Sequence, residues 1–277
     1  MRPAQRAQLA LLLEVAATPT PGNVDRRNDH PDLRFEQFLA GAVGAADGLA
    51  DAAGDGPLGA AFERAVAGMA AAQSGGNTQF GALLLLAPLV RAASGGELTP
   101  ERATAVVEAT DVEDAAAFCR SFDDVDVAVG APPPGLEDVD VRDPQEAAAA
   151  VRREELTLHG LLARSAEVDG VAREWTEGFE RSFDAAERLL AGGDALVERA
   201  NEVFLELLAE EPDAFVVKRH GPEAAARASE GAREVLEGER PPDELAAALR
   251  ADGVNPGTTA DLLAAGLYIA LERGATV

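Results

Sequence analysis

The chain has 277 residues, with 49 acidic side chains against 24 basic ones and a formal net charge of −25 at pH 7. This balance argues against nucleic acid or an anionic membrane surface as a partner, because binding either one requires clustered positive charge. Aromatic residues make up only 4%, and the apolar residues are mainly Ala and Leu, which favour helices over strands. The composition therefore predicts an all-α protein.

The acidic excess also predicts where the protein works. Charges of one sign repel each other in dilute buffer, whereas 1 M salt screens them beyond about 3 Å. A GC-rich genome would explain why Lys218 is the only lysine, but it does not explain a twofold acidic excess. Cys119 is the only cysteine, and we find neither a signal peptide nor an apolar run long enough to span a bilayer. We expect a halophilic, cytoplasmic protein.

Apolar spacing typical of helices continues along most of the chain, interrupted by Gly- and Pro-rich segments. It predicts one bundle of about 10–13 helices, over residues 4–17, 33–53, 57–72, 79–93, 99–110, a short helix up to 120, and 144–166, 170–190, 194–210, 222–237, 241–251 and 258–272. Residues 123–143 are the one long irregular stretch. They could form a linker between domains, but we interpret them as a surface excursion within a single domain covering residues 1–277.

Four polar breaks place small or rigid residues next to an apolar helix. They lie at Glu14 with residues 18–25, at residues 75–81, at Asp213 with residues 218–221, and at residues 253–261. A Gly-rich entry to a helix presents free backbone N–H groups at the positive end of the helix dipole, which suits phosphate. The second and fourth breaks have this form, although plain capping of two buried helices would explain the same pattern. Neither contains the Gly-Lys-Ser/Thr of a P-loop.

Taken together, the four breaks resemble motifs of the triphosphoribosyl-dephospho-coenzyme A synthases. After Glu14, residues 19–25 read Pro-Thr-Pro-Gly-Asn-Val-Asp, similar to the family's Pro-x-Pro-Gly-x-Val-Asp. Residues 75–81 resemble its Gly-x-Asn-Thr-His-Lys-Gly, and Asp213 with residues 219–221 resembles its Asp followed by Arg-x-Gly. Residues 255–264 are similar to its Ser-Pro-Gly-Gly-x-Ala-Asp-Leu-Leu-Ala. The four motifs occur in the family's order and span nearly the whole chain.

This resemblance implies an all-helical enzyme that joins ATP to dephospho-coenzyme A through a ribosyl bond, releasing adenine and keeping the triphosphate. Such a glycosyl transfer needs a base near the acceptor hydroxyl, an acid near the leaving adenine, and negative charge beside an oxocarbenium-like C1. It also needs Mg²⁺ and cationic or backbone donors for the triphosphate. The implied partners are therefore small molecules, ATP and dephospho-coenzyme A, and the oligomeric state stays open.

The resemblance also assigns site residues by position. Glu14, Asp25 and Asp261 are the implied catalytic carboxylates, and the same three residues together with Asp213 are the implied Mg²⁺ ligands. Which carboxylate acts as base and which as metal ligand is not distinguished. The implied nucleotide or phosphate contacts are Asn77, Thr78, Gln79, Arg219, Gly257 and Thr258.

Two departures from the family pattern bear on the substrates. Gln79 and Phe80 stand where the family has His-Lys, which removes a cation suited to a triphosphate, and Thr258 stands where the family has a second glycine. An archaeal side branch of the same fold, a transferase or hydrolase with another acceptor or nucleotide, is therefore the alternative. A non-catalytic helical interaction protein is a third reading, which would not need four polar breaks carrying Glu, Asp, Asn and Thr.

Overall fold

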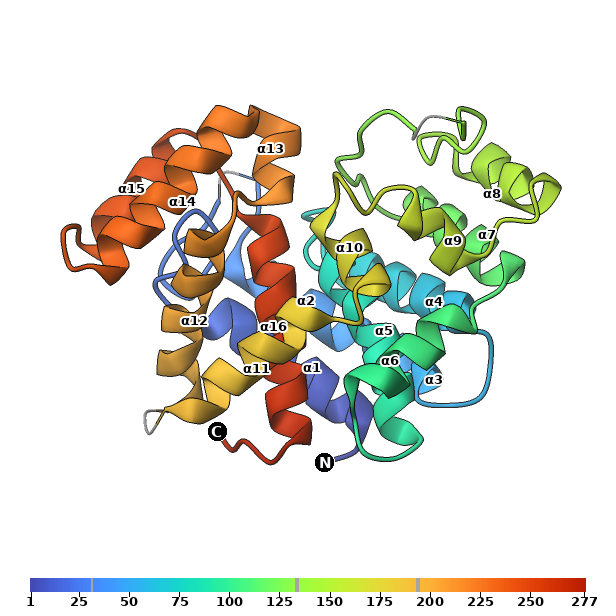
Figure 1. Ribbon diagram of the computed structural model, residues 1–277, viewed down its shortest axis with the longest axis horizontal. Helices are drawn as coiled ribbons and strands as arrows, with labels where there is room; N and C mark the ends of the chain where they lie inside the picture. The colour runs from blue at the N-terminus through green and yellow to red at the C-terminus, as the bar shows by residue number, and fades with distance from the viewer. Residues whose placement is uncertain (31, 133–134, 193–194) are drawn as a thin grey trace.

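A computed structural model describes residues 1–30, 32–132, 135–192 and 195–277 (Figure 1). Within these ranges the chain is all-α, with sixteen α-helices, one short 3₁₀ helix and no strand, apart from an isolated bridge between Asp25 and Asn28. The helices are α1 (Pro3–Ala16), α2 (Phe35–Gly44), α3 (Ala46–Ala52), α4 (Leu58–Ala71), α5 (Phe80–Ser94), α6 (Pro100–Glu108), α7 (Val112–Arg120), η1 (Ser121–Asp123), α8 (Pro144–Arg153), α9 (Leu158–Ala163), α10 (Gly170–Thr176), α11 (Glu180–Ala191), α12 (Leu196–Glu210), α13 (Ala214–His220), α14 (Pro222–Leu236), α15 (Pro242–Ala251) and α16 (Gly257–Glu272).

Three of the predicted helices are each divided into two. α2 and α3 meet at Ala45, and Glu155, with a left-handed φ of 51°, lies between α8 and α9. Gly178 and Phe179, with φ of 71° and 61°, separate α10 from α11. α13 is a helix where the spacing predicted only a polar break. The predicted helix start at residue 194, and prolines 133 and 134 of the irregular stretch, lie outside the described residues.

Two apolar helices, α5 and α16, form the centre of the molecule. Both are buried along most of their length, as expected for helices that are hydrophobic all round. α1, α11 and α12 pack against α16, while α4, α6 and α10 pack against α5, and their buried residues form one continuous core. Cys119 is fully buried, which raises the pKa of its thiol to about 12. None of the helices in the described ranges is long and apolar enough to span a bilayer.

The two ends of the chain lie together. α1 packs along α16, Arg6 pairs with Glu272 at 3.0 Å, and both termini lie at the lower edge of Figure 1. At the opposite ends of these helices the first polar break packs on the fourth, because Asn23 Nδ2 donates to the Pro256 carbonyl at 3.1 Å. Gly22, with φ of 86°, fits closely there, since a Cβ would lie 2.5 Å from the carbonyl oxygen of Val254. The fold thus joins motifs from both ends of the chain.

Candidate functional site

A cavity of about 840 Å³ is lined by residues of α13 and the start of α16 and by parts of α7, α9 and α10. We call it the main cavity. Figure 1 shows α13 on one side of the molecule and α7, α9 and α10 on the other. The beginning of α5 and the loop before α2 also contribute to its walls. Eight predicted site residues line it, namely Glu14, Asn77, Thr78, Gln79, Arg219, Gly257, Thr258 and Asp261. Asp25 and Asp213 are not among the lining residues.

Glu14 and Asp261 reach the main cavity without forming an ion pair to any described residue. The Glu14 side chain on α1 is 5% exposed, and burial raises its pKa well above the usual value, with the charge of Asp261 adding to the effect. The Asp261 carboxylate lies against Gly81, where a Cβ would stand 2.0 Å from Oδ2. Burial also raises the pKa of Asp261, the charge of Asp213 adds to this, and a hydrogen bond from the Ala82 backbone opposes it.

Two interacting carboxyl groups with raised pKa values are equipped for proton transfer. The pair retains a proton at a pH where an ordinary carboxyl group is ionised. One member can then protonate a leaving group, while the ionised member accepts a proton or stabilises a developing positive charge. Glu14 and Asp261 lie on α1 and α16, which pack against each other, so the pair is held by rigid elements.

Asp25 directs its oxygens into its own loop. It is 1% exposed and accepts hydrogen bonds from the backbone N–H of Thr20 at 3.2 Å and of Arg27 at 2.8 Å. Asn28 Nδ2 donates to both of its carboxylate oxygens, at 3.0 and 3.1 Å. These bonds shape the loop at and just after the first polar break, so Asp25 anchors this loop, and its catalytic or metal-binding role stays a prediction.

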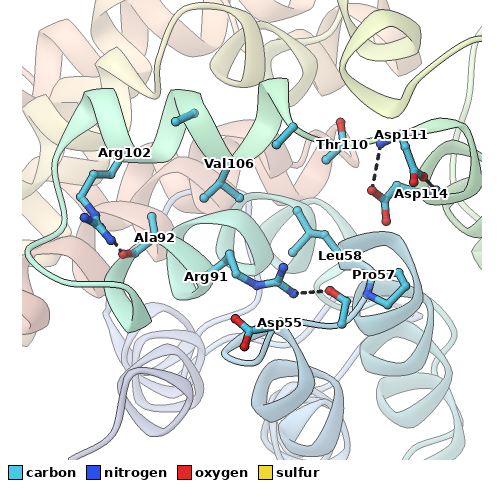
Figure 2. Close-up of a pocket in the computed structure, with 13 residues that line it drawn as sticks. Asp55, Pro57, Leu58, Arg91, Ala92, Arg102, Val106, Thr110, Asp111 and Asp114 are labelled. Carbon is cyan, nitrogen blue, oxygen red and sulfur yellow. Dashed lines mark hydrogen bonds between the residues drawn. The ribbon is translucent and has the colours of Figure 1, made fainter.

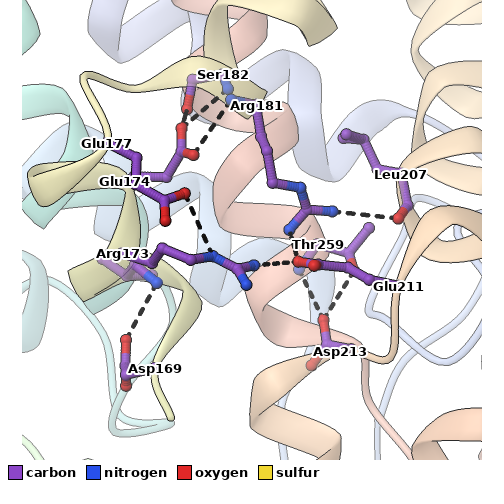
Figure 3. Close-up of polar contacts among 11 residues, drawn as sticks. Asp169, Arg173, Glu174, Glu177, Arg181, Ser182, Leu207, Glu211, Asp213 and Thr259 are labelled. Atoms are coloured by element: carbon purple, nitrogen blue, oxygen red, sulfur yellow. Dashed lines mark hydrogen bonds and ion pairs between the residues drawn. The ribbon is translucent and has the colours of Figure 1, made fainter. Parts of the chain in front are cut away.

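Asp213 likewise anchors a helix (Figure 3). It is 3% exposed, its Oδ1 accepts from the Val216 N–H at 3.0 Å, and its Oδ2 accepts from both the N–H and the Oγ1 of Thr259 at 2.8 Å. Nearby, Glu211 forms ion pairs with both Arg173 and Arg181, which ties this segment to α10 and α11. Asp213 therefore fixes the first turn of α16, and its charge acts on Asp261 from behind the cavity wall.

The two helix N-termini that the sequence offered for phosphate are partly occupied by the chain itself. At α5, Asn77 Oδ1 accepts from the Phe80 N–H at 3.0 Å. At α16, Asp213 takes the N–H of Thr259. The N-cap residues Gln79 and Pro256 make no side-chain cap hydrogen bond, so these N–H groups are satisfied by Asn77 and Asp213 instead. Asn77 and Thr258 still line the main cavity beside the caps.

Four buried polar atoms on lining residues have no hydrogen-bond partner among the described residues. They are His30 Nε2, Thr78 Oγ1, Gln79 Oε1 and Asn255 Oδ1. The pKa of His30 is lowered, mainly by burial, with the charge of Arg219 adding to this effect and that of Asp32 opposing it. Unpaired buried polar groups cost free energy, so they gather where a ligand or water completes them. The predicted site left out Asn255, although it lies in the fourth break. His30, beyond the first break, was interpreted from the sequence either as a ligand or acid or as an exposed turn residue.

The position where the family has lysine is filled here by an aromatic core residue. The ring of Phe80 is 5.1 Å from that of Phe62 and 4.9 Å from that of Phe122, measured between centroids. Instead, α13 supplies positive charge to the main cavity, because Lys218 and Arg219 line it. Lys218 pairs with Asp169 at 3.0 Å, and the Arg219 guanidinium lies 5.9 Å from the centroid of the Phe215 ring.

The irregular stretch also belongs to the site. Residues 126–132 and 139–141 line the main cavity, so the excursion is a wall of the site as well as a surface feature. Val139 is buried, and Val127 and Val141 pack against the core. The alternating Val and Asp residues carried no motif, which is why sequence reasoning did not place this segment at the site.

A second cavity, of about 690 Å³, lies between the α3–α4 turn, α5, α6 and α7 (Figure 2). Its polar groups bind the chain itself. Arg91 donates to the carbonyls of Ala52 at 2.7 Å and Gly56 at 2.8 Å, and Asp114 accepts from the Gly59 N–H at 2.7 Å. None of the unpartnered buried atoms found in the described ranges lies on a residue of this cavity.

The four predicted Mg²⁺ ligands do not form one cluster. In the part of the chain that the structure describes, no group of three or more His, Cys, Asp and Glu side chains could hold a metal ion. Mg²⁺ in nucleotide enzymes is held by one or two carboxylates together with substrate phosphates and water. The Glu14–Asp261 pair fits such a site, because its oxygens face the cavity without an ion-pair partner, whereas the oxygens of Asp25 and Asp213 are engaged.

Comparisons with known proteins agree with the motifs. Residues 1–276 match the family model described as ATP:dephospho-CoA triphosphoribosyl transferase. A 2-(5''-triphosphoribosyl)-3'-dephosphocoenzyme-A synthase of Pectobacterium atrosepticum is 31% identical, over 94% of this chain and 85% of that protein. A crystal structure of an Archaeoglobus fulgidus protein described as a triphosphoribosyl-dephospho-CoA synthase superposes with a TM-score of 0.70 and 28% identity, over 86% of this chain and all of that one. The chain therefore belongs to the ATP:dephospho-CoA triphosphoribosyl transferase family.

Proposed function

We propose that this enzyme transfers the triphosphoribosyl group of ATP to dephospho-coenzyme A, with release of adenine, in the main cavity. The observation that carries the proposal is the Glu14–Asp261 pair, two cavity-facing carboxyl groups with raised pKa values on packed helices. Family membership supplies the reaction class. Four unpartnered polar atoms around the pair supply sites that a ligand can complete.

The chemistry exchanges one bond at C1 of the ATP ribose for another. The C1–N bond to adenine breaks, and a bond forms between C1 and a hydroxyl oxygen of the acceptor. The ionised member of the pair takes the hydroxyl proton, and the protonated member gives a proton to adenine, so charge and protons balance. The negative charge of the pair also favours the oxocarbenium-like transition state.

The triphosphate lies, in this proposal, along the wall formed by α5, α13 and α16. Asn77, Thr78 and Gln79 contact it or the sugar from one side, and Arg219, Gly257 and Thr258 from the other, since all six line the main cavity. Mg²⁺ would be held mainly by the substrate phosphates and water, and the ion would neutralise the charge of the triphosphate. Asp25 and Asp213 hold the two loops in place.

The assay for this function is incubation with ATP, Mg²⁺ and dephospho-coenzyme A in molar KCl, with separation of the products. We expect free adenine in equal amount to the coupled product. ADP or phosphate without adenine contradicts the proposal. Adenine release with another acceptor, and none with dephospho-coenzyme A, supports the alternative of a same-fold transferase with a different acceptor.

We further propose that residues 1–277 form a single domain adapted to the salt-rich cytoplasm of a halophilic archaeon. The support is the net charge of −25, which molar salt screens at short range. The melting temperature should therefore rise steeply as KCl is increased from about 0.1 to about 3 M. A melting temperature that is independent of KCl over this range contradicts salt adaptation.

A further inference from the structure

One wall of the main cavity is aromatic, in a chain that contains few aromatic residues. Five of the ten phenylalanines line the cavity, namely Phe38, Phe80, Phe118, Phe122 and Phe215. Three of these rings form one contiguous group. The Phe122 centroid lies 4.9 Å from that of Phe80 and 5.2 Å from that of Phe118, and Phe80 and Phe118 are 6.2 Å apart. The proposed reaction gives these rings no role.

Phe122, on η1, is the ring of this group that remains partly accessible. Phe80 and Phe118 are 6% and 7% exposed, whereas Phe122 is half-buried at the cavity surface. Its ring plane makes an angle of 60° with Phe80 and of 82° with Phe118, so two neighbours hold it from different directions. A ring held in this way loses little conformational freedom when a ligand stacks on it.

Small and β-branched side chains line the cavity on the segment that follows Phe122 in the chain. Residues 127–131, together with Val139 and Val141, line the same cavity with small or β-branched side chains. Asp126 and Asp140 also line it, while the cationic and neutral polar groups come from other segments, among them Arg219, Asn255 and Thr258. The cavity therefore presents one wall suited to a charged chain of phosphates and one suited to a planar, weakly polar ring.

We propose that the wall centred on Phe122 is a subsite for an adenine ring, which stacks on the Phe122 phenyl group. This inference rests on the proposed function, because both ATP and dephospho-coenzyme A carry adenine. Aromatic side chains bind nucleobases by stacking on the π-face, whichever nucleotide carries the base. The pantetheine arm of the acceptor has no ring to stack, so it gains nothing specific from a phenyl group compared with a leucine side chain.

Binding can be read directly with Phe122→Trp. Trp175 is the only native tryptophan, and it is 1% exposed, with its indole N–H donating to the Leu84 carbonyl at 3.2 Å. Adenosine monophosphate should therefore quench the fluorescence of the introduced indole, while pantetheine should not, and the wild type should give no comparable signal. No quenching by adenosine monophosphate at millimolar concentration overturns the subsite, and so does quenching by pantetheine alone.

Kinetics of Phe122→Leu, which keeps an apolar side chain but removes the ring, test the same subsite in the reaction. The KM for one adenine-bearing substrate should rise about 5- to 150-fold, with kcat within about threefold of wild type. A rise in the KM for ATP assigns the subsite to the donor, and a rise in that for dephospho-coenzyme A assigns it to the acceptor.

The matched control is Phe35→Leu, at a half-buried phenylalanine of α2 that does not line the cavity. Unchanged KM values in Phe122→Leu, or equal effects of both variants, contradict the subsite, provided that circular dichroism shows both variants folded. If wild type releases no adenine in the assay above, the proposed function fails, while the fluorescence titration still decides whether adenine binds at Phe122.

Discussion

The main cavity and the second cavity have similar volumes but opposite polar chemistry. Around the main cavity, four buried polar atoms lack partners, and two carboxyl groups have raised pKa values. In the second cavity, Arg91 donates its hydrogen bonds to backbone carbonyl groups, and Asp114 accepts from a backbone N–H group. A hollow in the surface therefore does not identify a site here. What distinguishes the two is which polar groups the fold leaves for a ligand to satisfy.

The largest expected effect is on catalysis at the main cavity. Glu14→Gln keeps the shape of the side chain but can neither release nor accept the proton, so kcat for adenine release should fall about 10²- to 10⁴-fold. Asp114→Asn, at a buried carboxylate of the second cavity, is the matched control and should leave kcat within about threefold of wild type. Equal losses in the two variants would remove the distinction between the cavities.

The free energy of unfolding should be affected more by a substitution in the second cavity than by one in the main cavity. Asp114 accepts from the N–H groups of Gly59 at 2.7 Å and Asp111 at 3.0 Å, so Asp114→Ala should lower the free energy of unfolding by about 2–4 kcal/mol. Glu14→Gln removes a buried carboxyl group that Asp261 repels, and it should leave the stability unchanged or higher. Urea unfolding of both variants in the same KCl concentration measures this, and a large destabilisation by Glu14→Gln would contradict it.

A smaller effect should appear in the pH dependence of stability. The folded-state pKa of Glu14 is raised above its unfolded value of about 4.3, so the protonated form favours folding. This contribution is fully present below the unfolded pKa and is lost as pH rises through the folded one. The free energy of unfolding should therefore fall less between pH 5 and pH 9 in Glu14→Gln than in wild type. Parallel curves would show that Glu14 is not perturbed.

Much of the fold follows from local sequence signals. Thr99 and Pro100 predicted the start of α6, and Thr99 does accept a hydrogen bond from the Arg102 N–H at its N-cap. The breaks at Glu155 and Phe179 were missed, although Thr157 caps α9 just after the first and Gly178, with a positive φ, stands directly before the second. Apolar spacing alone predicts one continuous helix across each of them, because it does not weigh a single cap or glycine residue.

The candidate site was predictable as a set of segments but not as a set of roles. Four carboxylates stand in similar motif positions, namely Glu14, Asp25, Asp213 and Asp261. Nothing in the sequence distinguishes which of them take part in the reaction. Only the hydrogen bonds separate them, since Asp25 and Asp213 hold loop and helix backbone while Glu14 and Asp261 face the main cavity. The excursion at 126–132 could not be placed, because its contribution comes from tertiary position and not from a motif.

The most direct test of the central claim is a crystal structure of Glu14→Gln with ATP and Mg²⁺. The inactivated variant should retain ATP in the main cavity. The adenine nitrogen bonded to C1 should lie within hydrogen-bond reach of the side chain at position 14 or 261, and the triphosphate should lie along α5, α13 and α16. ATP in the second cavity, or ATP in the main cavity with this nitrogen turned away from both positions, would contradict the assignment of Glu14 and Asp261 as the reacting pair.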